Sequence, residues 1–263
     1  MYSIWHPLRY LSYLGNLAVD TGILKMDKDN IQRIISNGLA EMNLQTGAAE
    51  KLVLYEELLL EKNKVMNLTA ITDSEKAAKL HILDSAELLT LLNFQNLSVL
   101  DVGTGAGLPG VVLKLIEPSI KLTLLDSMGK RIHWLEEISS SLMIDDTEFI
   151  YGRAEDYGIK SEYRQHYDVV TSRAVAEMRI LCELCIPFVK VGGKFLAMKS
   201  IECDEEIAAA EHSIKALGGR LSSCTDYQIP GTDISHRIII IEKCSPTKNI
   251  YPRRFSKIQK MPL

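Results

Sequence analysis

A cluster of glycines directly after an apolar run constrains this chain more than any other part of its 263 residues. Residues 97–102 have the apolar side chains of a buried strand, and residues 103–110 contain four glycines. Glycine lets the backbone turn sharply and approach a ligand where a Cβ atom would collide. Pro109 suits the first turn of a following helix, because its φ is already helical. A strand, a glycine turn and a helix N-terminus predict a cradle for a nucleotide-type cofactor.

The alternation of apolar patterns along the chain predicts an α/β fold. Apolar residues at helical spacing mark residues 27–42, 48–66 and 75–92, and we expect the first two to form a small helical cap. Strand-like runs then alternate with helix-like runs that begin at Pro109, Gly129, Ala174 and Asp204. Such alternation builds a mostly parallel sheet covered on both faces. The last two strands have no helix between them and predict an antiparallel hairpin. The seven expected strands are residues 97–102, 121–126, 147–151, 167–171, 194–199, 222–229 and 237–243.

Composition divides the chain into four expected parts. Residues 1–25 lack the pattern of a signal peptide, and a strongly helical sequence starts at Met26, so we expect a non-native or disordered extension before it. Residues 26–72 form the cap and residues 73–245 the cofactor-binding domain. Residues 246–263 form a basic tail, and from Glu242 to Leu263 six basic residues stand against one acidic residue, although the whole chain carries a net charge of −4. Such a tail either contacts phosphates or is simply solvated.

The cysteines and the lengths of the apolar segments favour a cytoplasmic protein. No apolar stretch reaches the roughly 20 residues that span a bilayer. Cys182 and Cys185 have a spacing found in metal and redox sites, but no second pair exists and both lie in an apolar helical run. We therefore expect buried thiols and no metal.

The glycine turn alone does not select one cofactor. Residues 105–110 match G-x-G-x-x-G, which folds that bind NAD, FAD or S-adenosylmethionine (SAM) share. Asp126 ends the second expected strand, where a carboxylate accepts hydrogen bonds from ribose hydroxyls. However, Asp101 precedes alternating glycines in a pattern that resembles the signature of class I SAM-dependent methyltransferases, and the terminal hairpin is similar to the reversed last strand of that fold. We expect SAM, with an NAD-dependent oxidoreductase as the alternative.

Two further positions fit a cofactor pocket. Ala154 and Glu155 follow the third expected strand, where an adenine rests between apolar groups and a polar contact. Arg173 closes the fourth strand, near the switch point where ligands bind in open α/β sheets. A solvated acid and a surface arginine are the alternatives for Glu155 and Arg173.

From Met26 onward the chain resembles the RsmG (GidB) family, the bacterial 16S rRNA guanine-N7 methyltransferases. Several motifs carry the resemblance in order, namely Asn67-Leu-Thr, His81-Ile-Leu-Asp84-Ser, residues 101–110, Asp126-Ser-Met-Gly-Lys130-Arg131, Ala154-Glu155, Ser172-Arg173-Ala-Val-Ala and His236-Arg237. The resemblance implies a seven-stranded class I SAM-dependent methyltransferase domain at residues 73–245. It implies guanine 527, in the 530 loop of small-subunit rRNA, as the target. The residues that it implies as SAM contacts are Gly103, Gly105, Leu108, Asp126, Ala154, Glu155 and Arg173.

Guanine N7 carries a lone pair and no proton, so its methylation needs alignment and desolvation rather than a general base. Arg173 is the candidate positioning residue, because it can contact the SAM carboxylate and order the loop that faces the acceptor. Asn67 is either a turn former or a base contact, and His81 either faces the pocket or braces the cap together with Asp84. Contacts to RNA are expected from Asn67, His81, Lys130, Arg131, Lys199, Arg237, Arg253 and Arg254, although each cation alone also fits a solvated residue.

The tail departs from the family pattern, because Arg253 and Arg254 are followed by Phe255 and Ser256 rather than by Pro-Gly. The expected partner is 16S rRNA or a precursor of the small ribosomal subunit, and we expect a monomer that does not bind membranes. A SAM fold that binds RNA or regulates without catalysis is a second alternative.

Overall fold

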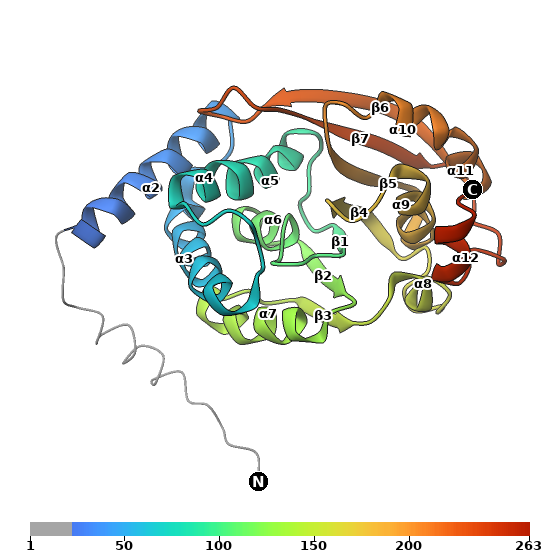
Figure 1. Ribbon diagram of the computed structural model, residues 1–263, viewed down its shortest axis with the longest axis horizontal. Helices are drawn as coiled ribbons and strands as arrows, with labels where there is room; N and C mark the ends of the chain where they lie inside the picture. The colour runs from blue at the N-terminus through green and yellow to red at the C-terminus, as the bar shows by residue number, and fades with distance from the viewer. Residues whose placement is uncertain (1–22) are drawn as a thin grey trace, which may run out of the picture.

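A computed structural model describes residues 23–263, so the predicted extension at residues 1–25 lies almost entirely outside the described residues. The chain forms one seven-stranded sheet in the order β3-β2-β1-β4-β5-β7-β6, which confirms the predicted α/β fold with its terminal hairpin (Figure 1). No helix in this described part is long and apolar enough to cross a membrane. The strands are β1 (Ser98–Val102), β2 (Lys121–Asp126), β3 (Thr147–Tyr151), β4 (Tyr167–Arg173), β5 (Val189–Ser200), β6 (Gly219–Gln228) and β7 (Ser235–Lys243).

The register of the parallel strands brings their carboxyl ends to one edge of the sheet. β1 pairs in parallel with β2 and β4, β2 with β3, and β4 with β5, whereas β7 runs antiparallel to both β5 and β6. Asp101 of β1 lies opposite Thr171 of β4, and Asp126 of β2 lies opposite Tyr151 of β3. The strand order reverses between β1 and β4, and a crevice at such a switch point is where open α/β sheets bind ligands.

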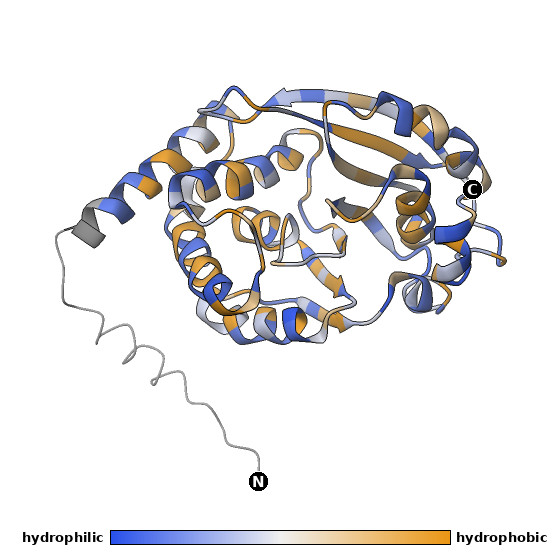
Figure 2. Ribbon diagram, viewed as in Figure 1, coloured by the Kyte–Doolittle hydropathy of each residue, from blue (hydrophilic) through white to orange (hydrophobic). Residues whose placement is uncertain are grey.

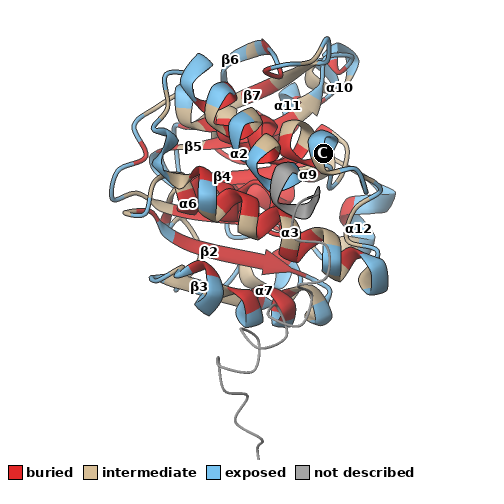
Figure 3. Ribbon diagram, turned by 90° about the vertical axis from the view of Figure 1, so that its left-hand side faces the viewer, coloured by how far each residue is buried: buried red, intermediate tan, exposed pale blue. Residues whose placement is uncertain are grey.

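Helices cover both faces of the sheet and bury two apolar layers against it (Figures 1 and 2). Figure 3 shows the buried residues on the strands and on the inner sides of the helices. One face is covered by α2 (Ile23–Glu41), α3 (Ala49–Met66), α6 (Gly110–Ile116), α7 (Gly129–Leu142) and the run from Ser74 to Thr90. The other face is covered by α8 (Ala154–Tyr157), α9 (Met178–Cys185), α10 (Asp204–Ala209), α11 (Glu211–Ala216) and α12 (Phe255–Lys260).

Two predicted helices differ from the structure in form or in their starting residue. The run expected at residues 75–92 is divided into α4 (Ser74–Ala77), the π-helical segment η2 (Ala78–Leu83), α5 (Asp84–Ala86) and the 3₁₀ segment η3 (Glu87–Thr90). The helix expected from Ala174 begins at Met178 instead. Ala174 has a φ of 56°, which is left-handed and incompatible with a helix, so residues 174–177 form a loop after β4.

The predicted cap is part of the main apolar core. Side chains of α2 and α3 belong to the same buried cluster as those of α6 and α7. The hydroxyl of Tyr55 on α3 donates a buried hydrogen bond of 2.6 Å to the carbonyl of Ala106 in the glycine turn. Helix α3 therefore contacts the turn directly.

The C-terminal segment also packs against the domain and is not a free, solvated tail. Ile258 of α12 is fully buried, and the carbonyl of Leu263 accepts a hydrogen bond from Ser213. The guanidinium of Arg164 donates to the carbonyls of Tyr251 and Thr247, at 2.7 Å each. The ends of this segment are thus fixed at several points.

Candidate functional site

The glycine turn lies between β1 and α6, and its geometry requires glycine. Gly103, Gly105 and Gly107 have φ values of +70°, +58° and +94°, a region that other residues rarely adopt. A Cβ on Gly107 would lie 2.6 Å from Val111, and one on Gly103 would lie 2.5 Å from Val175. A Cβ on Gly105, in contrast, would meet no heavy atom closer than 3.9 Å. The turn is thus packed on its inner side and open at Gly105, where a ligand can approach the backbone.

Asp101 fixes the turn from within the protein. Its side chain is fully buried, and one carboxylate oxygen accepts hydrogen bonds from the hydroxyl of Thr104 at 2.7 Å and the N–H of Gly110 at 3.0 Å. The other oxygen accepts from Thr171 at 3.0 Å. Burial raises the pKa of Asp101, and these hydrogen bonds oppose the rise. The first acid of the glycine motif therefore organises the turn and joins β1 to β4.

Asp126 stands at the end of β2 beside the open part of the turn. One oxygen accepts the N–H of Gly105 at 2.9 Å, and the other accepts the N–H of Met128 at 2.8 Å. Arg131 lies 3.5 Å from the first oxygen. Because a carboxylate has about four acceptor sites, it retains capacity for ribose hydroxyls after these bonds.

Ala154 and Glu155, predicted at the adenine end, begin the short helix α8 after β3, and both are buried. Burial raises the pKa of Glu155. Leu108 is buried in the glycine turn. Leu108 follows β1, and Ala154 and Glu155 follow β3, so all three lie at the same carboxyl edge of the sheet as Asp126.

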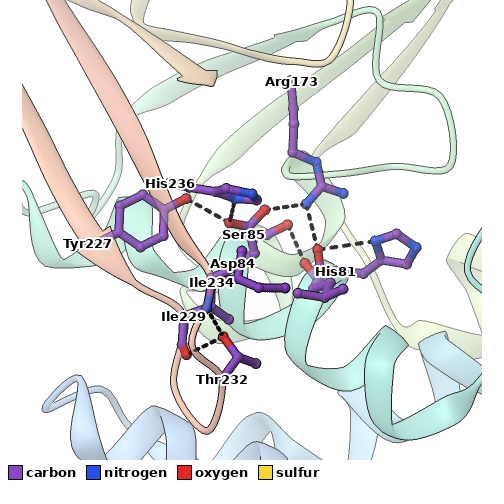
Figure 4. Close-up of polar contacts among 10 residues, drawn as sticks. His81, Asp84, Ser85, Arg173, Tyr227, Ile229, Thr232, Ile234 and His236 are labelled. Atoms are coloured by element: carbon purple, nitrogen blue, oxygen red, sulfur yellow. Dashed lines mark hydrogen bonds and ion pairs between the residues drawn. The ribbon is translucent and has the colours of Figure 1, made fainter. Parts of the chain in front are cut away.

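Arg173, at the end of β4, reaches across to the helical run before β1. Its Nη1 donates to Asp84 at 2.8 Å and to the carbonyl of Leu80 at 3.3 Å. Figure 4 shows that Tyr227 and His236 approach the same carboxylate, with distances of 2.7 and 2.8 Å to its other oxygen. Although burial alone would raise the pKa of Asp84, the bonds from His236 and Tyr227 and the charge of Arg173 lower it. Asp84 therefore remains ionised at the centre of this cluster.

His81 and Asn67 occupy positions that favour their structural interpretations. The ring of His81 is mostly buried, and its Nε2 lies 2.8 Å from the hydroxyl of Thr69. Burial, with the nearby charge of Arg173, lowers the pKa of His81 to about 4, so the ring is neutral near pH 7. Asn67 ends α3 with a φ of 50° and its N–H bonds to Asn63, as expected of a turn former.

Four of the cations predicted to contact RNA are paired with acidic side chains, and one of them is Arg131, which lies 3.5 Å from Asp126. Lys199 lies 2.6 Å from Glu206, and Arg237 bonds to Asp226 and Asp204. Arg253 donates to both oxygens of the buried Glu183, at 2.6 to 3.1 Å. By contrast, two predicted contacts are exposed and form no ion pair with any residue in the described range, namely Lys130 and Arg254.

The thiols of α9 are inaccessible. Cys182 and Cys185 are fully buried, and burial raises the pKa of each. No three His, Cys, Asp or Glu side chains among residues 23–263 are arranged to hold a metal ion.

Sequence reasoning missed two tyrosines that contribute to the site. Tyr55 had the helical spacing of a core residue, and Tyr227 lay in an expected strand. Each hydroxyl finds its partner far away in the sequence, at Ala106 and Asp84 respectively. Nothing in the local sequence pattern signals such a bond.

The strand order with a reversed β7, together with the glycine turn at the switch point, defines a class I SAM-dependent methyltransferase fold. A solved chain from the "complex between the Haloferax volcanii Trm112 methyltransferase activator and the putative methyltransferase" shares this fold, with a TM-score of 0.51 and 15% identity over 66% of this chain and 94% of that one. Within that class, the chain belongs to the GidB family, described as rRNA small subunit methyltransferase G, whose model matches residues 48–234.

Curated relatives with the same family name match most of this chain and most of their own length. The ribosomal RNA small subunit methyltransferase G of Alkaliphilus metalliredigens is 40% identical over 236 residues, which cover 88% of this chain and 98% of that protein. The protein of the same name from Clostridium botulinum is 43% identical over 212 residues, covering 80% and 89%.

Proposed function

We propose that this protein transfers a methyl group from SAM to N7 of guanine 527 in the 530 loop of 16S rRNA. The observation that carries the proposal is the family match across residues 48–234, which include the glycine turn, Asp126 and Arg173. The relatives named above supply the small-subunit rRNA as the substrate class.

The residues at the carboxyl edge of the sheet fit SAM. Gly105 leaves its Cβ direction open in a turn that is otherwise packed, which suits close approach of a ligand to the backbone. We assign the ribose to Asp126, the adenine to Leu108, Ala154 and Glu155, and the methionine carboxylate to Arg173. When bound, SAM supplies an electrophilic methyl group on its sulfonium.

The chemistry around this edge suits an acceptor that already has a lone pair. The sequence at the end of β4 is Arg173-Ala-Val-Ala, without the Asn-Pro-Pro-aromatic motif typical of amino-group methyltransferases. Cys182 and Cys185 are buried and cannot attack a base, and His81 is bonded within the protein. Alignment and exclusion of water are therefore the main contributions that we assign to the protein.

The fold weighs against the oxidoreductase alternative. The usual dinucleotide-binding sheet is parallel throughout its order 3-2-1-4-5-6, whereas β7 here is inserted antiparallel between β5 and β6. Calorimetry with SAM and with NAD on the purified protein tests which cofactor it binds. Heat of binding from NAD and none from SAM would favour the oxidoreductase.

The decisive experiment maps N7-methylguanine in 16S rRNA from cells with and without the gene. We expect the modification at guanine 527 to disappear in the deletion strain and to return with the wild-type gene. A Gly105→Val copy should not restore it. An unchanged modification in the deletion strain would refute the assignment, and SAM binding without transfer to rRNA or to small subunits would indicate a non-catalytic protein.

A further inference from the structure

Asp84 is a buried carboxylate that joins four segments far apart in the sequence. It lies in α5 and is 1% exposed. Its partners are Arg173 at the end of β4, Tyr227 on β6 and His236 on β7, which are 89, 143 and 152 residues away. Figure 4 shows the three side chains converging on it. A buried charge with this many partners is costly to leave unpaired, so the arrangement holds each partner in place.

The contact with Asp84 uses only one edge of the Arg173 guanidinium. Nη1 makes both of its hydrogen bonds, to Asp84 and to the carbonyl of Leu80. Nε and Nη2 donate to no residue in the described part of the chain, although the side chain is only 16% exposed. A guanidinium is a planar fork that binds a carboxylate through two parallel N–H groups. Arg173 is thus fixed in orientation and has donors left over.

The same part of β4 lies beside the glycine turn. Thr171 is paired with Asp101 in the sheet and bonds to its carboxylate, so Arg173 extends past the end of β1 next to the turn. Val175, two residues further on, packs against Gly103, where an added Cβ would lie 2.5 Å from its methyl group. The residue that Asp84 anchors therefore begins the loop that covers the turn.

We propose that Asp84 is a positioning residue for the cofactor, holding Arg173 by one edge so that its remaining N–H groups bind the carboxylate of SAM. This inference rests on the proposed function. Tyr227 and His236 bond to the second oxygen of Asp84 and keep its first oxygen directed at Arg173. The terminal hairpin thereby contributes to cofactor binding without touching the cofactor.

The test compares the binding of SAM with that of decarboxylated SAM, which lacks only the carboxylate. Hydrogen bonds to charged groups are worth about 1.5–3 kcal/mol, so wild-type protein should prefer SAM roughly 10- to 150-fold. In Asp84→Asn this preference should fall to about 3-fold or less, because an amide no longer holds the guanidinium electrostatically. The affinity for decarboxylated SAM should stay close to that of wild type. Isothermal calorimetry measures both affinities.

Asp168→Asn is the matched control. Asp168 lies near the opposite end of β4, where it pairs with Lys190 and bonds to Ser98, so it undergoes the same chemical change away from the turn. Its substitution should leave the preference for SAM unchanged. General damage to the sheet would instead lower the affinity for both ligands in either variant.

Two outcomes overturn the inference. One is an Asp84→Asn protein that loses affinity equally for both ligands, and the other is one that binds both ligands with wild-type affinity. If Asp84→Asn does not fold, Arg173→Lys replaces it, because an ammonium keeps the charge but not the two parallel donors. Arg173→Lys should lower the preference about 10-fold, as expected for one lost charged hydrogen bond, and an unchanged preference would again overturn the inference. Failure of the proposed function is distinguishable, since wild-type protein would then bind neither ligand or leave rRNA unmodified.

Discussion

Removal of the Arg253 side chain should destabilise the protein strongly, although the residue lies in a basic segment that resembles an RNA-binding tail. Glu183 on α9 is fully buried, and Arg253 gives it three side-chain contacts of 2.6, 2.8 and 3.1 Å and a backbone N–H at 2.8 Å. In Arg253→Ala only the backbone N–H remains. Loss of one partner of a buried ion pair costs about 3–5 kcal/mol. For a domain of this size, that corresponds to a decrease in Tm of about 6 to 20 °C.

Urea unfolding followed by circular dichroism measures this loss. The neighbouring Arg254 is exposed and forms no ion pair within residues 23–263, so Arg254→Ala should change the free energy of unfolding by about 0.5 kcal/mol or less. Adding Glu183→Gln to Arg253→Ala should recover part of the loss, because it removes the unpaired charge. The reasoning fails if Arg253→Ala unfolds like wild type while its binding to 16S rRNA weakens, since Arg253 would then contact phosphate instead.

Four further variants test the glycine turn and the buried cysteine and lysine side chains. Gly105→Val should abolish SAM binding in calorimetry, because its side chain fills the open side of the turn, and should cost about 1–3 kcal/mol of stability, because a φ of +58° strains a branched residue. Cys182→Ser and Cys185→Ser should retain methyl transfer while losing about 1–3 kcal/mol of stability, since each buries a hydroxyl; loss of transfer at normal stability would contradict this. Burial lowers the pKa of Lys243 to about 7. The unfolded chain then binds more protons between about pH 7 and 10, so stability should rise with pH there, and Lys243→Met should remove this slope in urea unfolding.

The sequence predicted the sheet well because its strands are short apolar runs bounded by turn residues. β2 and β3 begin and end where their patterns do, and the glycine turn has the positive φ values that its composition requires. The predicted start of α9 at Ala174 was wrong, because Ala174 adopts a left-handed conformation that no composition rule assigns to alanine. The π-helical segment η2 could not be predicted either, since its apolar pattern is that of an ordinary helix.

The side-chain pairs of the candidate site were less predictable than its location. The positions of Asp126, Ala154 and Arg173 at the carboxyl edge follow from topology, because parallel strands end at the same edge. The bond between Arg173 and Asp84 does not, since these residues are separated by 89 positions and by several elements. Sequence reasoning considers each cation singly, whereas Lys199 on β5 and Arg237 on β7 find acidic partners on α10 only when that helix packs beside these strands.

Buried acidic side chains explain why positive charge alone does not identify the cations that are free to bind RNA. Asp101, Asp84 and Glu183 each bond to groups from distant segments, and they fix the glycine turn, the end of β4 and the C-terminal segment respectively. A cation that satisfies a buried carboxylate cannot leave it for a phosphate without exposing the protein to the cost of an unpaired charge. Exposed cations without such a partner, such as Lys130 and Arg254, bear no such cost. Salt-dependent binding to rRNA should therefore weaken by about one phosphate contact in Lys130→Ala or Arg254→Ala, and the same slope change in Arg253→Ala, whose partner Glu183 is buried, would contradict this argument.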